Sequence, residues 1–312
     1  MELSYLTKLR IAAAAAVGVI LIGILAWPLA KPADPFLPVL SGNITLVSAI
    51  TLAALAFLAG LAAYFLSWPY GREIGIIAVP AGLAIWAMRC GSVGNMIQLN
   101  PSLAHREVLF ASLKWEPIFW LVIVLIGFAG VLLGQKILSR PRPEIEKMDY
   151  KSRSDKYINA AVAVVGSLLI SQFCLSIFTQ DIRLFDTRLG SVVAQPAAGQ
   201  IVFAVLVSFA IAAFVVKKFL NANYIWPIIA SGFITAFITT IYIKKDLLQY
   251  TAEQWPAVFF PRAVSAILPI QMVAIGTLGA IWGYWLAIRY NYWRQNEIWE
   301  PASKETAKRD FI

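Results

Sequence analysis

Charged side chains are scarce in this sequence of 312 residues. Only 14% of the residues are charged and 60% are hydrophobic, whereas about a quarter of the residues in a soluble domain are charged. This composition excludes an ordinary soluble domain and indicates an integral membrane protein. The net charge of +9 would suit nucleic acid in a soluble chain, but here Lys and Arg fill short gaps between apolar runs, where they set membrane topology. We therefore expect membrane lipids as partners, and no nucleic acid.

Histidine and cysteine are nearly absent, which limits the chemistry that the chain can carry. His105 is the only histidine, and Cys90 and Cys174 are the only cysteines. Bis-histidine haem ligation within the chain is excluded, and the usual zinc and iron–sulfur sites need more ligands than these. The lone histidine has no accompanying nucleophile-elbow motif. The sequence therefore predicts no catalytic set, no metal site and no resident cofactor.

Long hydrophobic runs, in contrast, are abundant. A run of about 20 residues crosses a 30 Å hydrocarbon layer, and the alternating pattern of a membrane barrel is absent, so we expect helices. The first run resembles a cleaved signal peptide in composition, but it has a counterpart deep inside the chain, which argues for a retained helix. The expected spans are residues 11–27, 44–68, 74–93, 117–138, 157–179, 201–220, 225–243 and 264–290.

Two glycine triplets with the same spacing occur 149 residues apart. Residues at i, i+3 and i+7 share one helix face, and a face without side chains lets helices pack closely. We expect the two faces to meet between the fourth and eighth helices; a gap-forming or oligomer-forming face is the alternative. The triplets are Gly127, Gly130 and Gly134, then Gly276, Gly279 and Gly283.

A second internal match supports a tandem duplication. Residues 11–22 align with residues 159–170 at an offset of 148, and agreement between the two offsets indicates a repeat of about 150 residues. Four helices per half give both halves the same orientation, so their pseudo-two-fold axis should follow the membrane normal. The expected domains are a first four-helix repeat at 1–148, a second at 149–290 and a cytoplasmic tail at 291–312.

The distribution of positive charge orients these helices. Of the 26 Lys and Arg residues, 17 fall in alternate gaps on one side and the remaining nine on the other. Positive charge is enriched on the cytoplasmic side. We therefore expect both termini in the cytoplasm. We interpret the membrane as the bacterial plasma membrane.

The expected outer loops are too apolar to be free loops. Apolar side chains in 96–113 and 247–260 indicate short helices that lie in the outer interface. Re-entrant segments that break at Pro101, Pro256 and Pro261 are the alternative. The expected fold is thus an all-α polytopic membrane protein of eight transmembrane helices, arranged as two parallel four-helix repeats with short interfacial helices in the outer loops.

Polar residues near the outer helix ends are the candidates for binding. Arg89, a charge four residues from the outer end of its expected span, can snorkel to the interface or turn inward toward Glu107 or Asp181. Two charge clusters could grip an anionic headgroup or a partner's surface, or could be ordinary solvated charges. The clusters are His105, Arg106 and Glu107 in the first half, and Asp181, Arg183, Asp186 and Arg188 in the second.

Two further sets of residues leave alternatives open. Cys90 and Cys174 lie at matching outer depths, where a disulfide between the halves is one option and free thiols filling small apolar gaps are the other. Hydroxyls and amides such as Thr235, Thr239 and Gln271 could bond backbone carbonyls or line a polar path. The lack of Asp and Glu within the expected spans argues against proton- or sodium-coupled transport.

These features favour a non-catalytic membrane subunit or scaffold. Its apolar outer loops and helix faces would dock other membrane subunits or further copies of the chain. The alternative is a permease or channel for a weakly charged or amphiphilic solute, with its path along the repeat interface. Such transporters usually have polar or helix-breaking residues at matching mid-membrane positions, and the only trace of this here is Pro80 and Pro227, near the starts of the third and seventh expected helices.

Overall fold

The computed structural model describes residues 4–31, 38, 40, 44–138, 153–180, 183–188, 190–242, 244–253 and 259–309. The described residues up to Leu138 form a group of helices that we call the N-terminal group. It consists of α1 (Tyr5–Gly18), the π-helix η1 (Val19–Leu25), α2 (Trp27–Ala30), α3 (Leu46–Leu66), α4 (Gly71–Ile74), the 3₁₀-helix η2 (Gly75–Ile77), α5 (Ala78–Arg89), α6 (Val93–Leu99) and α7 (Leu103–Leu138).

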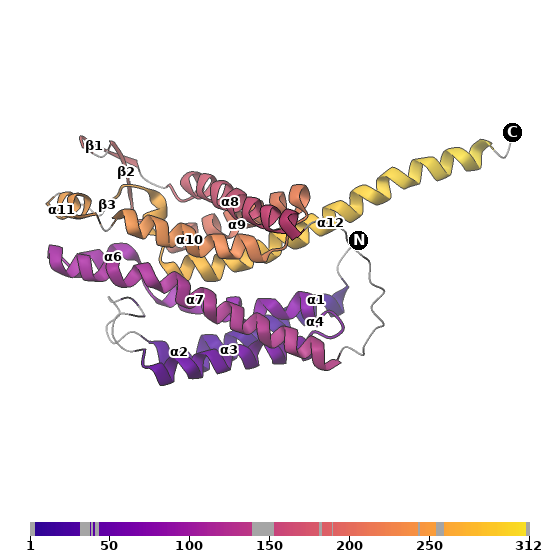
Figure 1. Ribbon diagram of the computed structural model, residues 1–312, viewed down its shortest axis with the longest axis horizontal. Helices are drawn as coiled ribbons and strands as arrows, with labels where there is room; N and C mark the ends of the chain where they lie inside the picture. Colours follow the sequence, from indigo (N-terminus) through magenta and orange to yellow (C-terminus); the bar gives the residue numbers. More distant parts are fainter. Residues whose placement is uncertain are drawn as a thin grey trace.

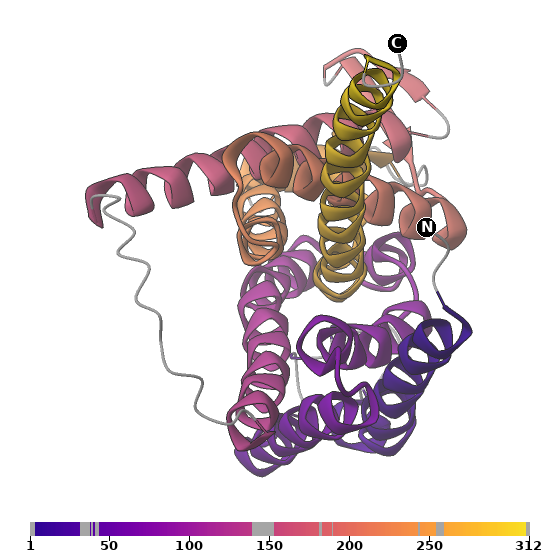
Figure 2. The ribbon, with the colours of Figure 1, turned by 90° about the vertical axis from the view of Figure 1, so that its right-hand side faces the viewer.

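The remaining described residues form the C-terminal group. It consists of α8 (Arg153–Phe178), β1 (Arg183–Asp186), β2 (Gly190–Ala194), α9 (Ala198–Leu220), α10 (Ile225–Tyr242), α11 (Lys245–Glu253), β3 (Phe259–Phe260), the 3₁₀-helix η3 (Ala263–Ala266) and α12 (Pro269–Arg309). The two groups lie side by side along the length of the molecule (Figures 1 and 2).

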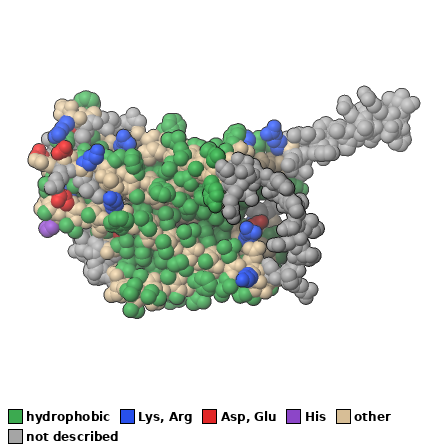
Figure 3. Space-filling view, in the orientation of Figure 1, with side chains coloured by type: hydrophobic (Ala, Val, Ile, Leu, Met, Phe, Trp, Pro, Cys, Tyr) green, Lys and Arg blue, Asp and Glu red, His purple; other side chains and the backbone are tan. Residues whose placement is uncertain are grey.

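The long helices run between two distinct ends of the molecule, and α8 is inclined to the others (Figures 1 and 2). Both chain termini lie at one end, which we call the termini end, whereas α6, α11 and the strands lie at the opposite end, which we call the sheet end (Figure 1). Seven described helices are long and apolar enough to cross a membrane, and α10 together with α11 makes an eighth if this bent pair is one broken span. Hydrophobic side chains cover the middle of the visible face and charged ones lie toward its two ends (Figure 3), as expected for a multi-pass membrane protein.

The fourth span differs from its expected extent. We expected it to begin at Pro117 after a separate interfacial helix, but α7 is one continuous helix of 36 residues with Pro117 inside it. A proline removes one backbone donor without necessarily ending a helix. The side chains that suggested an interfacial helix, among them Leu109, Phe110 and Leu113, are instead buried on the part of α7 that precedes the proline.

The segment 183–194 departs from the expected all-α fold. It forms an antiparallel hairpin in which Arg183 pairs with Val193 and Asp186 with Gly190, and β3 adds a third strand on the other side of β2. Two signals explain the hairpin. Val192 and Val193 favour strands, and Gly190 adopts φ +76°, which an L-residue rarely does.

Helix packing is similar within the two groups. In the N-terminal group, α3 packs along α7, and α1 with η1 packs against α5; in the C-terminal group, α9 packs along α12, and α8 packs against α10. Between the groups, α5 contacts α12, α7 contacts α10, and α7 contacts α12. These contacts make α5, α7, α10 and α12 the interface between the groups.

The last helix passes through the expected domain boundary at residue 290. Helix α12 continues to Arg309 and projects beyond the other helices at the termini end (Figure 1). The expected boundary between the two repeats, at residues 148 and 149, lies outside the described residues.

Candidate functional site at the interface between the two groups

Two glutamine side chains link the groups near the sheet end. Gln271 of α12 donates from Nε2 to the backbone carbonyl of Ala87 in α5 at 3.2 Å. Gln195, which follows β2, accepts at Oε1 from the backbone N–H of Gly94 in α6 at 2.9 Å and donates from Nε2 to the carbonyl of Ala266 at 3.3 Å. Hydrogen bonds at these distances fix the relative position of the groups.

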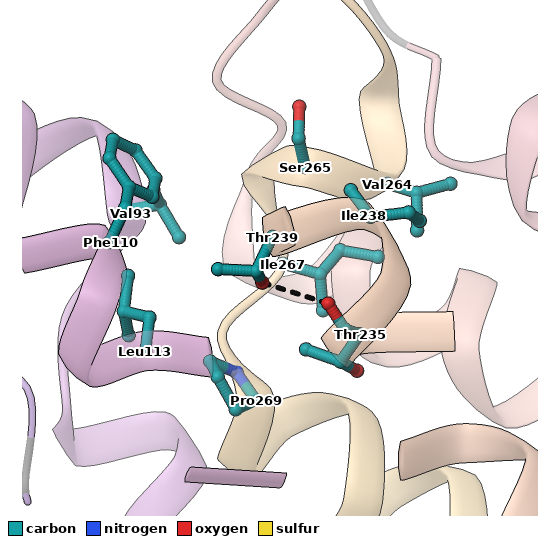
Figure 4. Close-up of a pocket in the computed structure, with 10 residues that line it drawn as sticks. All are labelled: Val93, Phe110, Leu113, Thr235, Ile238, Thr239, Val264, Ser265, Ile267 and Pro269. Atoms are coloured by element: carbon teal, nitrogen blue, oxygen red, sulfur yellow. Dashed lines mark hydrogen bonds between the residues drawn. The ribbon is translucent and has the colours of Figure 1, made fainter. Parts of the chain in front are cut away.

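A small cavity lies beside these links (Figure 4). One wall of the cavity is formed by Phe110 and Leu113 of α7 and by Val93 of α6. The opposite wall is formed by α10 and by the segment from η3 to the start of α12. The space of the cavity is about 20 Å³, room for about one water molecule. The side chains of the second wall are Thr235, Ile238, Thr239, Val264, Ser265, Ile267 and Pro269.

The threonine hydroxyls of this cavity are engaged with their own helix. Thr235 donates to the carbonyl of Ser231 at 3.0 Å, and Thr239 donates to that of Thr235 at 2.8 Å. Such i−4 bonds satisfy a hydroxyl within an apolar bundle. In this structure the groups therefore enclose room for a single water and leave no solute-sized passage at this cavity.

The glycine triplets face other helices than the two that we expected to meet. A Cβ atom at Gly130 would collide with the carbonyl oxygen of Phe57 in α3, and one at Gly279 with that of Leu206 in α9. The first triplet thus brings α7 onto α3 within the N-terminal group. The second brings α12 onto α9 within the C-terminal group. The expectation that the two faces meet each other was wrong because i, i+3, i+7 spacing identifies a packing face but not its partner.

The first charge cluster is divided by burial. Arg106 is buried and donates from Nε to the carbonyl of Asn100 at 3.0 Å, while His105 is exposed and Glu107 half-buried on the same helix. About three turns after them, the buried carboxylate of Glu116 accepts a hydrogen bond from the backbone N–H of Leu40 at 3.1 Å. Sequence reasoning missed Glu116 because it directly precedes the expected start of the fourth span.

The second cluster belongs to the hairpin. Tyr250 of α11 donates its hydroxyl to both carboxylate oxygens of Asp186, at 2.8 and 2.9 Å, and the guanidinium of Arg188 lies 4.9 Å from the Tyr250 ring centroid. Arg183 begins β1, and Asp181 lies outside the described residues. The structure therefore joins Asp186 and Arg188 to an aromatic partner that the sequence pattern did not indicate.

Arg89 lies at the end of α5, exposed, with its guanidinium 5.6 Å from the ring centroid of Trp27. Trp27 in turn meets Trp86 edge to face, and Trp86 meets Trp120 in the same way. The indole N–H of Trp86 donates to the carbonyl of Gly23 in the π-helix at 3.2 Å. This tryptophan cluster was not predicted, because its members come from three separate spans.

Cys90 and Cys174 are both free and buried. Burial, and secondarily the carboxylate of Glu116, raises the pKa of the Cys90 thiol from 9.0 to about 12. A thiol with such a pKa is inert near neutral pH, because the thiolate is the reactive species.

Aromatic and charged side chains of the N-terminal and C-terminal groups meet at the termini end. Tyr224, just before α10, packs edge to face on Phe128 of α7 and on Tyr284 of α12. Burial raises the pKa of Tyr224, and the nearby Arg72 opposes this rise. Lys217 of α9 lies 5.0 Å from the Tyr284 ring centroid.

Among the described residues, no group of three or more His, Cys, Asp or Glu side chains is arranged to hold a metal ion. No protein-family model, no curated protein and no solved structure matches the chain.

Proposed function

We propose that the protein is a non-catalytic membrane subunit that docks a partner at its sheet end. The observation that carries this proposal is the exposure of Phe185 on β1, whose side chain is 87% exposed. Aromatic side chains contribute much of the free energy of interfaces when they are buried there. Leu184, its neighbour on the strand, is 43% exposed.

The position of β1 in the sheet supports the same role. The strand order is β1–β2–β3, so among the described strands β1 is an edge strand. An edge strand presents backbone donors and acceptors to which another chain can pair. The contact of Tyr250 with Asp186 ties the end of β1 to α11, which would hold the edge in place for such a partner.

We infer further that the two groups are duplicated four-helix units. The matching contact pairs within the groups, and the exchange of contacts between them (α5 with α12, α7 with α10), support a two-fold relation. A parallel duplication of this kind has its pseudo-axis along the membrane normal. Cytoplasmic termini and a bacterial plasma membrane follow in this proposal from the excess of positive charge at the termini end.

The second candidate function is a permease or channel along the interface between the groups. The cavity beside Thr235 and Thr239 supports it, since it lies where duplicated transporters place their sites. In this candidate the structure would be a closed state, and a solute would enlarge the cavity.

One purification separates the two candidates. The full-length protein, extracted from its native membrane in mild detergent, should retain stoichiometric subunits that native mass spectrometry detects. Phe185→Ser should release them, whereas Phe219→Ser, a matched change at a 73% exposed site on α9 at the termini end, should not. A lone monomer that a solute stabilises against heat would favour the permease.

A further inference from the structure

Polar side chains converge between the two groups at the termini end. The rings of Tyr224 and Tyr284 meet edge to face, with centroids 5.2 Å apart. Tyr224 also packs on Phe128 of the N-terminal group, at 6.0 Å. The ammonium of Lys217 lies 5.0 Å from the ring centroid of Tyr284. Two phenols and a cation therefore share one place at the interface between the groups.

Arg72 of α4 brings a second cation to this place. Burial raises the pKa of Tyr224 most, while Arg72 lowers it and Glu73 raises it, so both charges lie within electrostatic reach of the phenol. Arg72 and Glu73 are exposed, whereas Lys217, Tyr224 and Tyr284 are half-buried. We call Arg72, Lys217, Tyr224 and Tyr284 the termini-end cluster.

The termini-end cluster holds more hydrogen-bond donors than acceptors. Within the part of the chain that the structure describes, neither phenol hydroxyl makes a hydrogen bond, and neither does the guanidinium of Arg72. Lys217 makes one, to Oδ1 of Asn221 at 2.7 Å, although an ammonium has three donors and a guanidinium five. The group that fits beside these donors is an anion with several acceptor oxygens.

Both cations lie at the ends of membrane spans. Lys217 is three residues from the end of the span Ala198–Leu220, and Arg72 is the second residue of the span Gly71–Arg89. Basic residues and tyrosine rings at such positions are typical of the headgroup layer. The termini-end cluster is therefore accessible both to phospholipid headgroups and to soluble anions.

We propose that the termini-end cluster binds a phosphate group, carried by a phospholipid or by a soluble phosphate ester. Its oxygens accept charge-assisted hydrogen bonds from Arg72 and Lys217 and further bonds from the two phenols. Arg72 belongs to the N-terminal group and the other three residues to the C-terminal group. The bound phosphate therefore bridges the groups at the termini end, as the glutamine side chains do at the sheet end. This binding does not depend on the proposed docking role.

Native mass spectrometry and thermal unfolding of the delipidated full-length protein in mild detergent test the proposal. The probes are phosphatidic acid and glycerol 3-phosphate, because both carry a phosphate monoester and only the first has acyl chains. Phosphatidic acid should bind and raise the midpoint of unfolding, whereas diacylglycerol of the same chains, which lacks the phosphate, should not. Competition by glycerol 3-phosphate would assign recognition to the phosphate alone, and lack of competition would assign it to the lipid headgroup.

Four substitutions locate the bound phosphate. Arg72→Gln and Lys217→Gln should each weaken binding of phosphatidic acid about fivefold, the equivalent of about 1 kcal/mol for one lost cation. Tyr284→Phe removes a donor and keeps the ring, so it should weaken binding without unfolding the protein. Glu73→Gln removes the neighbouring negative charge and should strengthen binding, a change of opposite sign that a merely structural role would not produce.

Lys218→Gln is the matched control. Lys218 follows Lys217 on α9, but its ammonium lies 4.6 Å from the ring centroid of Tyr290, six residues beyond Tyr284 on α12. This substitution removes the same charge from the same end of the helix and should leave binding unchanged. An equal loss in Lys218→Gln, weaker binding in Glu73→Gln, equal retention of diacylglycerol, or no binding of either phosphate probe would each overturn the proposal.

Discussion

The side-chain amide of Gln271 donates to the backbone carbonyl of Ala87 at 3.2 Å and so joins α12 to α5. Ala87 lies in the last turn of α5, where carbonyls have no partner within the helix. The Oε1 atom of Gln271 accepts from the backbone N–H of Leu268 at 3.0 Å, just before α12 begins. One buried side chain therefore serves the end of a helix in one group and the start of a helix in the other.

Replacing this glutamine should destabilise the interface between the groups. Gln271→Leu leaves the carbonyl of Ala87 and the N–H of Leu268 without their partner in a buried site, at a cost of about 1–3 kcal/mol. The midpoint of thermal unfolding in detergent should fall by a few degrees. Gln249→Leu is the control, because Gln249 is exposed and bonds Glu253 on its own helix. A loss as large in the control would contradict the assigned role of Gln271.

The glycine faces should tolerate no side chain. In Gly130→Ala and Gly279→Ala the new methyl would meet the carbonyl oxygens of Phe57 and Leu206, and we expect each change to lower the free energy of unfolding by about 1–3 kcal/mol. Gly166→Ala on α8 is the matched control, since no heavy atom lies within 4 Å of its Cβ position. There alanine should raise stability by about 0.5–1 kcal/mol, because helical glycine is entropically costly. Chemical or thermal unfolding of the three variants measures this contrast.

Short-range patterns account for the parts of the fold that could be predicted. Hydrophobic run length located the membrane helices, because a segment in lipid must satisfy its own backbone. The spacing of Gly127, Gly130 and Gly134 identified a packing face, because the i, i+3, i+7 relation is local to one helix. The partner of that face, α3 instead of α12, depends on how whole helices associate and leaves no trace in the spacing.

The sites between helices were less predictable for the same reason. Trp27, Trp86 and Trp120 belong to three spans, and only packing brings them together. Pro117 suggested a helix boundary, yet α7 already begins at Leu103. Buried side chains lie on the part of α7 that precedes the proline. Thr235 and Thr239 were left open between a lumen and self-satisfied hydroxyls, and their bonds to Ser231 and Thr235 support the second interpretation.

The hairpin should loosen when its link to α11 is removed. Tyr250→Phe deletes the hydroxyl that donates to Asp186 at 2.8 and 2.9 Å, while it keeps the ring beside Arg188. Hydrogen–deuterium exchange of residues 183–194 should become faster, because local opening of the strand pair no longer breaks these bonds. Tyr157→Phe, at a 71% exposed site on α8, should leave the exchange of this segment unchanged. Unaltered exchange in Tyr250→Phe would show that the link does not hold the hairpin.

The Cys90 thiol should resist alkylation, and it should make the free energy of unfolding depend on pH in the alkaline range. Its pKa of about 12 lies above the ordinary 9.0, so a maleimide at pH 8 should label Cys90 far more slowly in the folded protein than after unfolding in SDS. Because the folded pKa is the raised one, the unfolded chain releases its proton first, and the free energy of unfolding should fall as pH rises from about 9 to 12. Cys90→Ala should reduce this pH dependence, as thermal unfolding across that window would measure. Rapid labelling of folded Cys90 at pH 8 in a Cys174→Ala background would refute its burial.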